Sequence, residues 1–277
     1  MSYGTLYLCA TPIGNLQDIT LRVLETLEAV DLVACEDTRK TLQLLNHFNI
    51  SKPVTSYYEH NKMSKGDVII QQLKDGKNIA LVSDAGMPGI SDPGYDLVQQ
   101  CLAEDIPFTV LPGAVAAVTG LVLSGLPTDR FSFEGFIPRQ KKERLQYFQN
   151  LLHEERTMIF YESPHRLEDT LKTLIEVFPD RPMAAARELT KKFEEIVRGT
   201  PSEVLAHFEA EGIRGEFVLL LHGADPAPPE ERGIDWAVER VAQLEADGIS
   251  QKDAIKQAAK EAGLSKRDVY NFIVQNK

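Results

Sequence analysis

Cysteine is scarce in this sequence, and the few cysteines that occur do not form a ligand pattern. Cys9, Cys35 and Cys101 stand far apart in a chain of 277 residues. Their odd number and their spacing fit neither a disulfide framework nor the paired ligands of a zinc site. Unpaired thiols are typical of a reducing compartment. We therefore expect three core cysteines in a cytoplasmic protein that holds no metal.

Long hydrophobic runs are also missing. Residues 1–5 show no basic start followed by an apolar stretch, so the sequence predicts no secretory signal. The longest weakly polar run, residues 114–126, is shorter than a bilayer span and is interrupted by glycine and serine. We expect this run to form a buried helix. Neither export nor insertion into a membrane is expected.

The sequence also lacks an excess of positive charge. The formal net charge is −11, which argues against indiscriminate binding of nucleic acid, because contacts to phosphate supply most non-specific affinity. The charge is uneven, since residues 249–277 hold six Lys or Arg against three Asp or Glu. A hydrophobic content of 43% and a charged content of 26% are typical of a folded globular protein. The length predicts two packed domains, with or without a small appendage.

Short apolar runs alternate with amphipathic stretches in the first half. Runs at 5–9, 32–35, 79–82 and 108–111 are apolar throughout, which is typical of strands covered on both faces. Helical patterns between them predict an α/β layer fold. The helices are expected to begin near Ile19, Thr38, Ser64, Gly94 and Ala114.

The second half predicts another α/β domain and a helical tail. Its expected strands are residues 131–136, 157–161, 183–186 and 216–221. Residues 224–233 are rich in proline and acidic side chains, which indicates a linker. The predicted organisation is therefore an N-terminal α/β domain at 1–124, a C-terminal α/β domain at 125–225, and a linker with a helix-turn-helix-like tail at 226–277.

Three loops rich in glycine and proline leave the expected strands of the first domain. They are residues 83–94, 10–16 and 111–115. The carboxyl ends of parallel strands share one edge of a sheet, where ligands bind in α/β folds. The spacing of the glycines matches neither a phosphate-binding P-loop nor a dinucleotide fingerprint. The loops predict a pocket, with ordinary surface turns as the alternative.

Several long motifs carry a resemblance to a known family. Residues 11–16, 35–39, 84–94 and 112–114 resemble the tetrapyrrole methylase superfamily, and residues 160–166 and 186–191 resemble its branch that methylates ribose in ribosomal RNA. The resemblance runs from about Tyr7 to Gly223 and implies a homodimer, no metal, and S-adenosylmethionine bound in the cleft between the two domains. The cofactor-binding residues that it implies are Pro12, Asp84, Gly86, Met87, Ile90, Val115 and Ala116 from the first domain, with Tyr161, Leu189 and Val218 from the second.

The reaction that the resemblance implies is methylation of a cytidine ribose 2′-hydroxyl in 16S ribosomal RNA. A hydroxyl is a poor nucleophile, so a nearby general base would assist it. The candidates are Glu36, Asp37, Glu162, His165 and Glu188.

Each candidate also has a structural interpretation. Asp37 is placed to cap the following helix, and Glu162 to pair with Arg166 across one helical turn. Ser163 and Pro164 are typical of a helix start, which would put His165 at a helix N-terminus. Glu188 could pair with Arg187 where the two domains meet.

Basic clusters are the candidates for contacting RNA. They comprise Arg139, Lys141, Lys142 and Arg144, together with Arg39, Arg166, Arg187 and Lys191, and Lys266 and Arg267 in the tail. The tail is predicted to form a helix-turn-helix of two short helices, with Ser250 and Ser265 as their N-caps. A packing appendage or a dimer contact is the alternative for the tail.

The expected partner is 16S ribosomal RNA within the assembled small subunit, because the acidic net charge weakens binding to free RNA. Two other functions stay open at this point. One is a methylase acting on a corrin-type small molecule, and the other is a non-catalytic regulator that binds nucleic acid through its tail.

Overall fold

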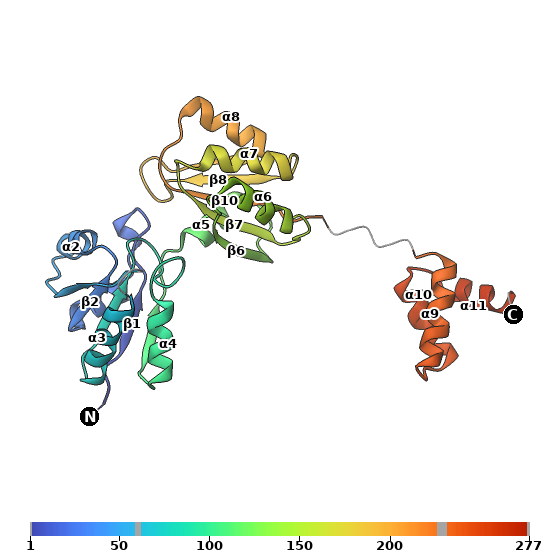
Figure 1. Cartoon of the computed structure of the whole chain (residues 1–277), viewed down its shortest axis with the longest axis horizontal. Helices are drawn as coiled ribbons and strands as arrows, with labels where there is room; N and C mark the ends of the chain where they lie inside the picture. Colours follow the sequence, from blue (N-terminus) through green and yellow to red (C-terminus); the bar gives the residue numbers. More distant parts are fainter. Residues whose placement is uncertain (1, 59–61, 226–231, 276–277) are drawn as a thin grey trace. The chain divides into compact units, whose positions relative to one another are not determined.

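The computed structural model describes residues 2–58, 62–225 and 232–275, and for residues 62–64 the backbone alone. The chain divides into two compact units, Met1–Ala224 and Asp225–Lys277. The predicted linker at 224–233 lies mostly outside the described residues. Unit 1 contains two five-stranded sheets, so the predicted α/β fold is confirmed (Figure 1).

The first sheet is parallel and has the strand order β3-β2-β4-β1-β5. Its strands are β1 (Leu6–Cys9), β2 (Leu32–Cys35), β3 (Val54–Ser56), β4 (Ile79–Val82) and β5 (Phe108–Leu111). Its helices are α1 (Leu21–Ala29), α2 (Thr38–His47), α3 (Lys62–Lys74) and α4 (Tyr95–Ala103). The sequence did not predict β3, which is a short edge strand whose side chains are only partly buried.

Alternate residues of each central strand enter separate cores on the two faces of this sheet. Ile79 and Leu81 of β4 pack with residues of α3 and α4, whereas Ala80 and Val82 pack with residues of α1 and α2. This explains why the strands read as continuous apolar runs, since no face meets water. Helices cover both faces, as the pattern predicted.

The second sheet is mixed and has the order β6-β7-β10-β8-β9, with only β6 and β7 parallel. Its strands are β6 (Phe131–Phe136), β7 (Thr157–Glu162), β8 (Met183–Arg187), β9 (Glu195–Gly199) and β10 (Phe217–Leu221). On one face its core includes residues of α6 (Lys141–Asn150), α7 (Leu167–Val177) and α8 (Pro201–Glu211). The sequence did not predict β9, whose side chains lie mostly at intermediate burial.

Helix α5 (Ala116–Ser124) covers the other face of the second sheet, although β5 of the first sheet precedes it. Ala117 and Leu121 are buried against β7, β8 and β10, and a Cβ added at Gly120 would lie 3.2 Å from Cγ1 of Val218. The expectation of a buried helix is only half correct, because Val118 is 46% exposed and Val122 is 70% exposed. The domain boundary after residue 124 remains a prediction.

The cysteines behave as expected from their spacing. Cys9, Cys35 and Cys101 are free and fully buried. Burial raises the pKa of the Cys9 thiol to about 12, so this sulfur is a core atom rather than a nucleophile. None of the helices in the described part of the chain is long and apolar enough to span a bilayer.

Unit 2 consists of α9 (Ile234–Ala246), α10 (Gln251–Glu261) and α11 (Lys266–Gln275) in the described residues. Ala254, Ala258 and Val269 are buried, with Leu264 packed at the edge of this small core. Ser250 accepts from the Asp253 N–H, and Ser265 accepts from the Asp268 N–H, so both predicted caps are confirmed.

Adjacent residues of α5 provide a test of its packing. Leu121→Ala should lower the free energy of unfolding by about 2–5 kcal/mol, because it leaves a cavity against the second sheet. At a protein concentration low enough to keep the chain monomeric, Val122→Ala, one residue along the same helix but facing outward, should change it by less than about 0.5 kcal/mol. Urea unfolding followed by far-ultraviolet circular dichroism measures the free energy of unfolding of both variants. Equal losses of stability in the two variants would contradict the packing described.

Candidate functional site

The three glycine- and proline-rich loops converge at the carboxyl edge of the first sheet. Their parent strands, β4, β1 and β5, are neighbours. Thr11 and Gly86 exchange backbone hydrogen bonds of 2.9 and 3.0 Å, which joins the loop after β1 to the loop after β4. A Cβ at Gly113 would lie 2.7 Å from Cβ of Ala10, so the loop after β5 also approaches closely. The predicted convergence is confirmed.

The loop after β4 is held in its shape by hydrogen bonds and by glycine. Ser83 Oγ donates to the Gly86 carbonyl at 2.9 Å, and Thr11 Oγ1 donates to the Ser83 carbonyl at 3.1 Å. Gly86 has φ +85°, a conformation that favours glycine, and a Cβ there would crowd Ile13 at 3.3 Å. The loop therefore presents backbone to whatever lies beside it.

A cavity of about 450 Å³ opens beside these loops and is walled by both sheets. Its volume is within the range of small-molecule and cofactor sites. Every predicted cofactor residue except Pro12 lines it: Asp84, Gly86, Met87, Ile90, Val115, Ala116, Tyr161, Leu189 and Val218. Pro12 lines an adjoining hollow of about 240 Å³ that shares Lys40 and Asp84 with the cavity.

Tyr161 joins the second sheet to the start of α5. Its hydroxyl accepts a 3.2 Å hydrogen bond from the Ala117 N–H, at a helix end that has no side-chain cap of its own. Its ring contacts Phe133 and Phe136 edge to face, with centroids 4.9 and 5.7 Å apart. Burial raises the pKa of this phenol, so the hydroxyl stays neutral near neutral pH.

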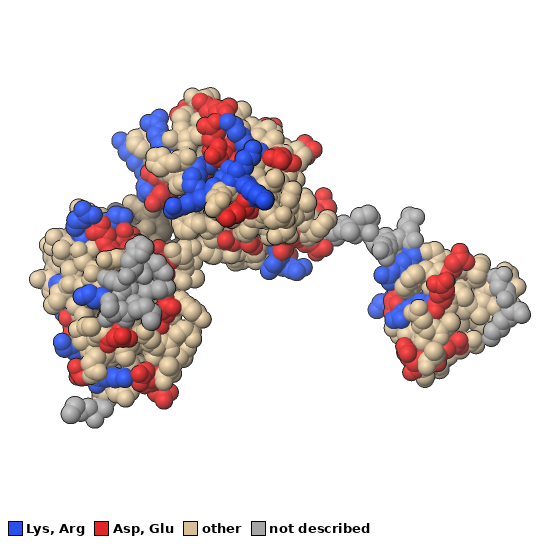
Figure 2. Space-filling model, viewed as in Figure 1, with Lys and Arg blue, Asp and Glu red and all other residues tan. Residues whose placement is uncertain are grey.

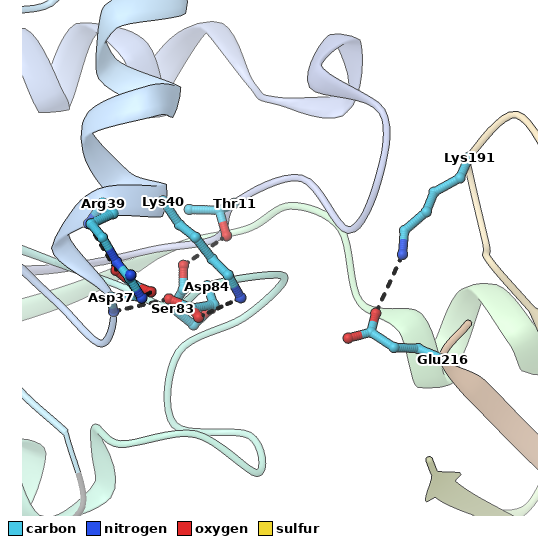
Figure 3. A network of polar contacts seen from close by, with 8 residues as sticks. All are labelled: Thr11, Asp37, Arg39, Lys40, Ser83, Asp84, Lys191 and Glu216. Carbon is cyan, nitrogen blue, oxygen red and sulfur yellow. Dashed lines mark hydrogen bonds and ion pairs between the residues drawn. The ribbon is translucent and has the colours of Figure 1, made fainter. Parts of the chain in front are cut away.

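Asp84 and Asp37 form a polar network at the edge of the cavity (Figure 3). Asp84 accepts from the Asp37 N–H at 3.0 Å and from Lys40 Nζ at 2.8 Å. Asp37 caps α2 by accepting from the Arg39 N–H at 2.8 Å, and it pairs with the Arg39 guanidinium at 2.9 Å. The Arg39 hydrogen bonds lower the pKa of Asp37 to about 2, which makes this carboxylate a poor proton acceptor.

Glu162, which lines the cavity, and Arg166 form a buried brace in its wall. The Glu162 carboxylate is fully buried and accepts from Thr170 Oγ1 at 2.7 Å and from the Ser163 N–H at 2.8 Å. Arg166 pairs with Glu162 at 3.4 Å and donates to the carbonyl oxygens of Ile137 and Pro138. The predicted ion pair is present, and its guanidinium is turned to the protein backbone.

The predicted helix start at Ser163 and Pro164 is wrong. Helix α7 begins at Leu167 after a turn, and Arg166 is its cap residue without a side-chain hydrogen bond. His165 consequently lies before the helix, is exposed, and is not among the residues that line the cavity.

Glu188 lies in the wall of the cavity in a left-handed backbone conformation, with φ +52°. Its Oε1 accepts from Lys191 Nζ at 2.9 Å and from the Glu216 N–H at 3.2 Å. Burial acts to raise the pKa of Glu188, but these two donors outweigh it and hold the pKa below its usual range. Figure 3 shows Lys191 reaching toward Glu216 as well, at 3.5 Å.

Asp92 is a cavity residue that the sequence analysis missed. Burial, together with the negative charges of Glu36 and Asp84, raises its pKa to about 6. Glu36 is exposed and does not line the cavity. Partial desolvation of its carboxyl group and the negative charge of Asp84 raise the pKa of Glu36 as well. Asp92 stands in the same glycine-rich loop as Asp84, so its position in the predicted pocket loop was the available signal.

The candidate RNA-binding residues divide into exposed and internal ones. Arg139, Lys141 and Lys142 are exposed at the start of α6, and Figure 2 shows Lys and Arg gathered on this half of unit 1. Arg144 was predicted wrongly, because it is only 3% exposed and its Nε donates to Thr173 Oγ1 at 3.0 Å.

Arg187 is also turned inward. It pairs with Glu195 at 2.5 Å instead of with Glu188, donates to the Gly212 carbonyl at 3.0 Å, and lies over the Phe208 ring. A guanidinium with these partners stabilises the second domain and is not free to meet a phosphate. Arg39 and Lys191 are engaged by Asp37 and Glu188, as described above.

Comparison with known proteins identifies the class. A family model described as Tetrapyrrole (Corrin/Porphyrin) Methylases matches residues 5–205. A crystal structure of uroporphyrin-III C-methyltransferase from Thermus thermophilus, complexed with S-adenyl homocysteine, has a TM-score of 0.55 over 78% of this chain and 97% of that chain, at 17% identity. At that identity the likeness shows the fold. The two-sheet fold is shared with that methyltransferase, and the chain belongs to the tetrapyrrole methylase family.

Closer relatives specify the branch. A protein of Halalkalibacterium halodurans named Ribosomal RNA small subunit methyltransferase I is 49% identical, with 98% of this chain and 95% of that protein covered. The protein of the same name from Bacillus subtilis is 47% identical, with 97% and 93% covered. This chain is therefore a member of that branch of the tetrapyrrole methylases, as its motifs predicted.

The brace in the wall of the cavity can be tested by removing one hydroxyl. Thr170→Val should lower the free energy of unfolding by about 1.5–3 kcal/mol, because it deprives a buried carboxylate of a hydrogen bond. Lys172→Ala, which breaks the exposed Lys172–Glu168 pair, should cost less than about 0.5 kcal/mol. Urea titration compares them, and a harmless Thr170→Val would show that Glu162 does not depend on this donor.

Proposed function

We propose that this protein transfers the methyl group of S-adenosylmethionine to the 2′-hydroxyl of a cytidine in 16S ribosomal RNA. The observation that carries the proposal is the cavity at the carboxyl edge of the first sheet, walled on its other side by the second sheet. The names of the close relatives support a ribosomal RNA substrate, and the resemblance of the motifs supports the ribose of a cytidine as the site.

The residues of the cavity fit a cofactor that is both apolar and cationic. Met87, Val115, Leu189 and Val218 offer an apolar surface for an adenosine group, and the loop around Gly86 offers backbone groups. Asp84 and Asp92 lie in the same lining and suit an ammonium and a sulfonium. Bound there, the cofactor supplies an activated methyl group, so the protein has to position the acceptor oxygen and take its proton.

Glu188 is the proton acceptor that the geometry favours among the candidates. Glu36, Asp37 and His165 do not line the cavity, and the carboxylate of Glu162 is committed to the brace. Glu188 lines the cavity, and its two hydrogen bonds within the described residues both go to Oε1. Oε2 makes no hydrogen bond within the described residues and can accept the proton of a hydroxyl, while the Lys191 ammonium keeps the carboxylate ionised before the transfer.

Exchanging the carboxylate of Glu188 for an amide tests its role. Glu188→Gln should lower kcat about 10²–10⁴-fold, the usual contribution of a general base, while the Kd for the cofactor changes little. Single-turnover methyl transfer and calorimetric titration of S-adenosylhomocysteine separate the two effects. An unchanged kcat would rule Glu188 out, and a lost cofactor affinity would assign it to binding instead.

The ionisation of Asp92 gives a prediction in pH. Because its pKa is about 6, Asp92 is negative above that pH and becomes neutral as the pH falls through it. A cationic cofactor binds the negative form better, so the affinity should fall as the pH is lowered from about 7.5 to about 5. Asp92→Asn should weaken binding about tenfold at neutral pH, or about 1.4 kcal/mol, and should remove the dependence.

Calorimetry of S-adenosylmethionine, which carries the sulfonium, across this pH range is the measurement. A parent protein whose affinity is the same at both ends would contradict the role of Asp92. A steep dependence that survives in Asp92→Asn would assign the effect to another carboxylate in the lining. Thermal unfolding of the variant serves as the control for folding.

We further propose that the substrate is the assembled small subunit, that the protein acts in the cytoplasm, and that it acts as a homodimer. A net charge of −11 weakens binding to free RNA, and the exposed Arg139, Lys141 and Lys142 offer a local basic surface. Val118 and Val122 form an exposed apolar face on α5, which supports the packing of a second copy of the chain against it.

Methyl transfer to isolated small subunits that lack ribose methylation tests the substrate. We expect label from S-adenosylmethionine to appear as 2′-O-methylcytidine on digestion and mass spectrometry, with weaker transfer to short transcripts. Label elsewhere would overturn the chosen acceptor. Absence of transfer to RNA with intact cofactor binding would favour a corrin-type acceptor, and absence of cofactor binding would favour a regulator.

A further inference from the structure

Unit 2 has a hollow of its own between the first turns of α10 and α11. Its volume is about 410 Å³. The residues that line it are Gln251, Lys252 and Ile255 from α10, and Lys266, Arg267 and Tyr270 from α11. Each helix therefore contributes cations beside an apolar or aromatic side chain, on a unit that is separate from the cavity described above.

None of the three cations that line this hollow forms an ion pair within the described residues. Lys252, Lys266 and Arg267 are exposed, and within the described part of unit 2 no carboxylate belongs to the lining. The two acidic residues in the same helical turns are engaged elsewhere: Asp253 accepts from Ser250 Oγ at 2.7 Å and Asp268 accepts from Ser265 Oγ at 2.6 Å. An anion would meet three cations there.

The placement of these cations opposes the stability of the helices. The first turn of a helix carries the positive end of its dipole, so Lys or Arg is unfavourable there and favourable in the last turn. Lys252 lies in the first turn of α10, and Lys266 and Arg267 open α11. A bound phosphate would meet these cations at the positive ends of two neighbouring helices.

An exposed aromatic ring completes the hollow. Tyr270 is 54% exposed, and Ile255 next to it is buried at 4% exposure. A flat ring beside cations is the arrangement that binds unpaired nucleotides, because a base stacks on the ring while the cations meet its phosphate. Double-stranded RNA is a poorer fit, since its major groove is too deep and narrow to admit a helix.

We propose that the hollow between α10 and α11 binds an unpaired stretch of RNA, with Lys252, Lys266 and Arg267 at its phosphates and one base stacked on Tyr270. The proposal rests on the proposed function only in taking ribosomal RNA as the natural occupant. It gives unit 2 the role of holding the substrate, separate from the chemistry of unit 1.

The experiment measures binding of a short single-stranded oligoribonucleotide to the full-length protein by fluorescence anisotropy. The triple variant Lys252→Ala, Lys266→Ala and Arg267→Ala should bind at least about tenfold more weakly. Its slope of log affinity against log salt should be lower by about 2, since each phosphate contact to a single strand contributes about 0.7. Tyr270→Leu should weaken binding, whereas Tyr270→Phe, which keeps the ring, should preserve it.

Two other lysines of α10 provide the matched control. Lys256 and Lys260 are exposed on the same helix but do not line the hollow. The pair Lys256→Ala and Lys260→Ala should leave binding within about twofold and should reduce the slope little, because these residues make no proposed phosphate contact. If the control pair loses as much affinity as the triple variant, the binding is non-specific electrostatic attraction and the proposal is overturned.

The remaining outcomes separate this site from the reaction. If the triple variant raises KM for small subunits and leaves kcat and cofactor affinity unchanged, the hollow holds the substrate. If it binds the oligoribonucleotide like the parent, the proposal fails even when methylation proceeds. If the parent methylates no RNA but the triple variant still loses affinity for the oligoribonucleotide, the proposed function fails while the proposal that the hollow binds RNA is supported.

Discussion

The close packing of α5 against β10 is the constraint on which the site depends. The chain leaves β5 of the first sheet, and α5 then lies on the second sheet, where Gly120 admits Val218 without a Cβ between them. The hydroxyl of Tyr161 accepts from the Ala117 N–H at the start of this helix. Val115 and Ala116 thereby become a wall shared by both sheets. A bulkier residue at 120 would separate two walls of one cavity.

Charge divides the molecule according to what each part has to bind. The cavity of unit 1 contains Asp84, Asp92, Glu188 and Glu216, a surplus of carboxylates that suits a cationic cofactor. The hollow of unit 2 and the start of α6 are basic instead. The net charge of −11 therefore describes neither site, and the charge of the residues that line each site is what predicts its ligand.

The sequence predicted the sheets and the pocket loops well, because both follow from local patterns. Continuous apolar runs predicted β1, β2, β4 and β5, and glycine with proline marked the loops at their ends. Partners distant in the chain could not be predicted in the same way. Arg144 looks like part of a basic surface until Thr173 of another helix is placed beside it. The bond between Glu162 and Thr170 likewise joins residues that only the folded chain brings together. Strands β3 and β9 lacked strong patterns because their side chains are only partly buried.

The brace of Glu162 and Arg166 has a mechanical consequence. Arg166 connects the end of β7 to the backbone of Ile137 and Pro138, immediately before the exposed basic residues at the start of α6. That basic surface is consequently anchored to the wall of the cavity rather than carried on an independent loop. An RNA strand seated on it would be held at a constant distance from the methyl group, so the choice of nucleotide becomes a matter of spacing along the strand.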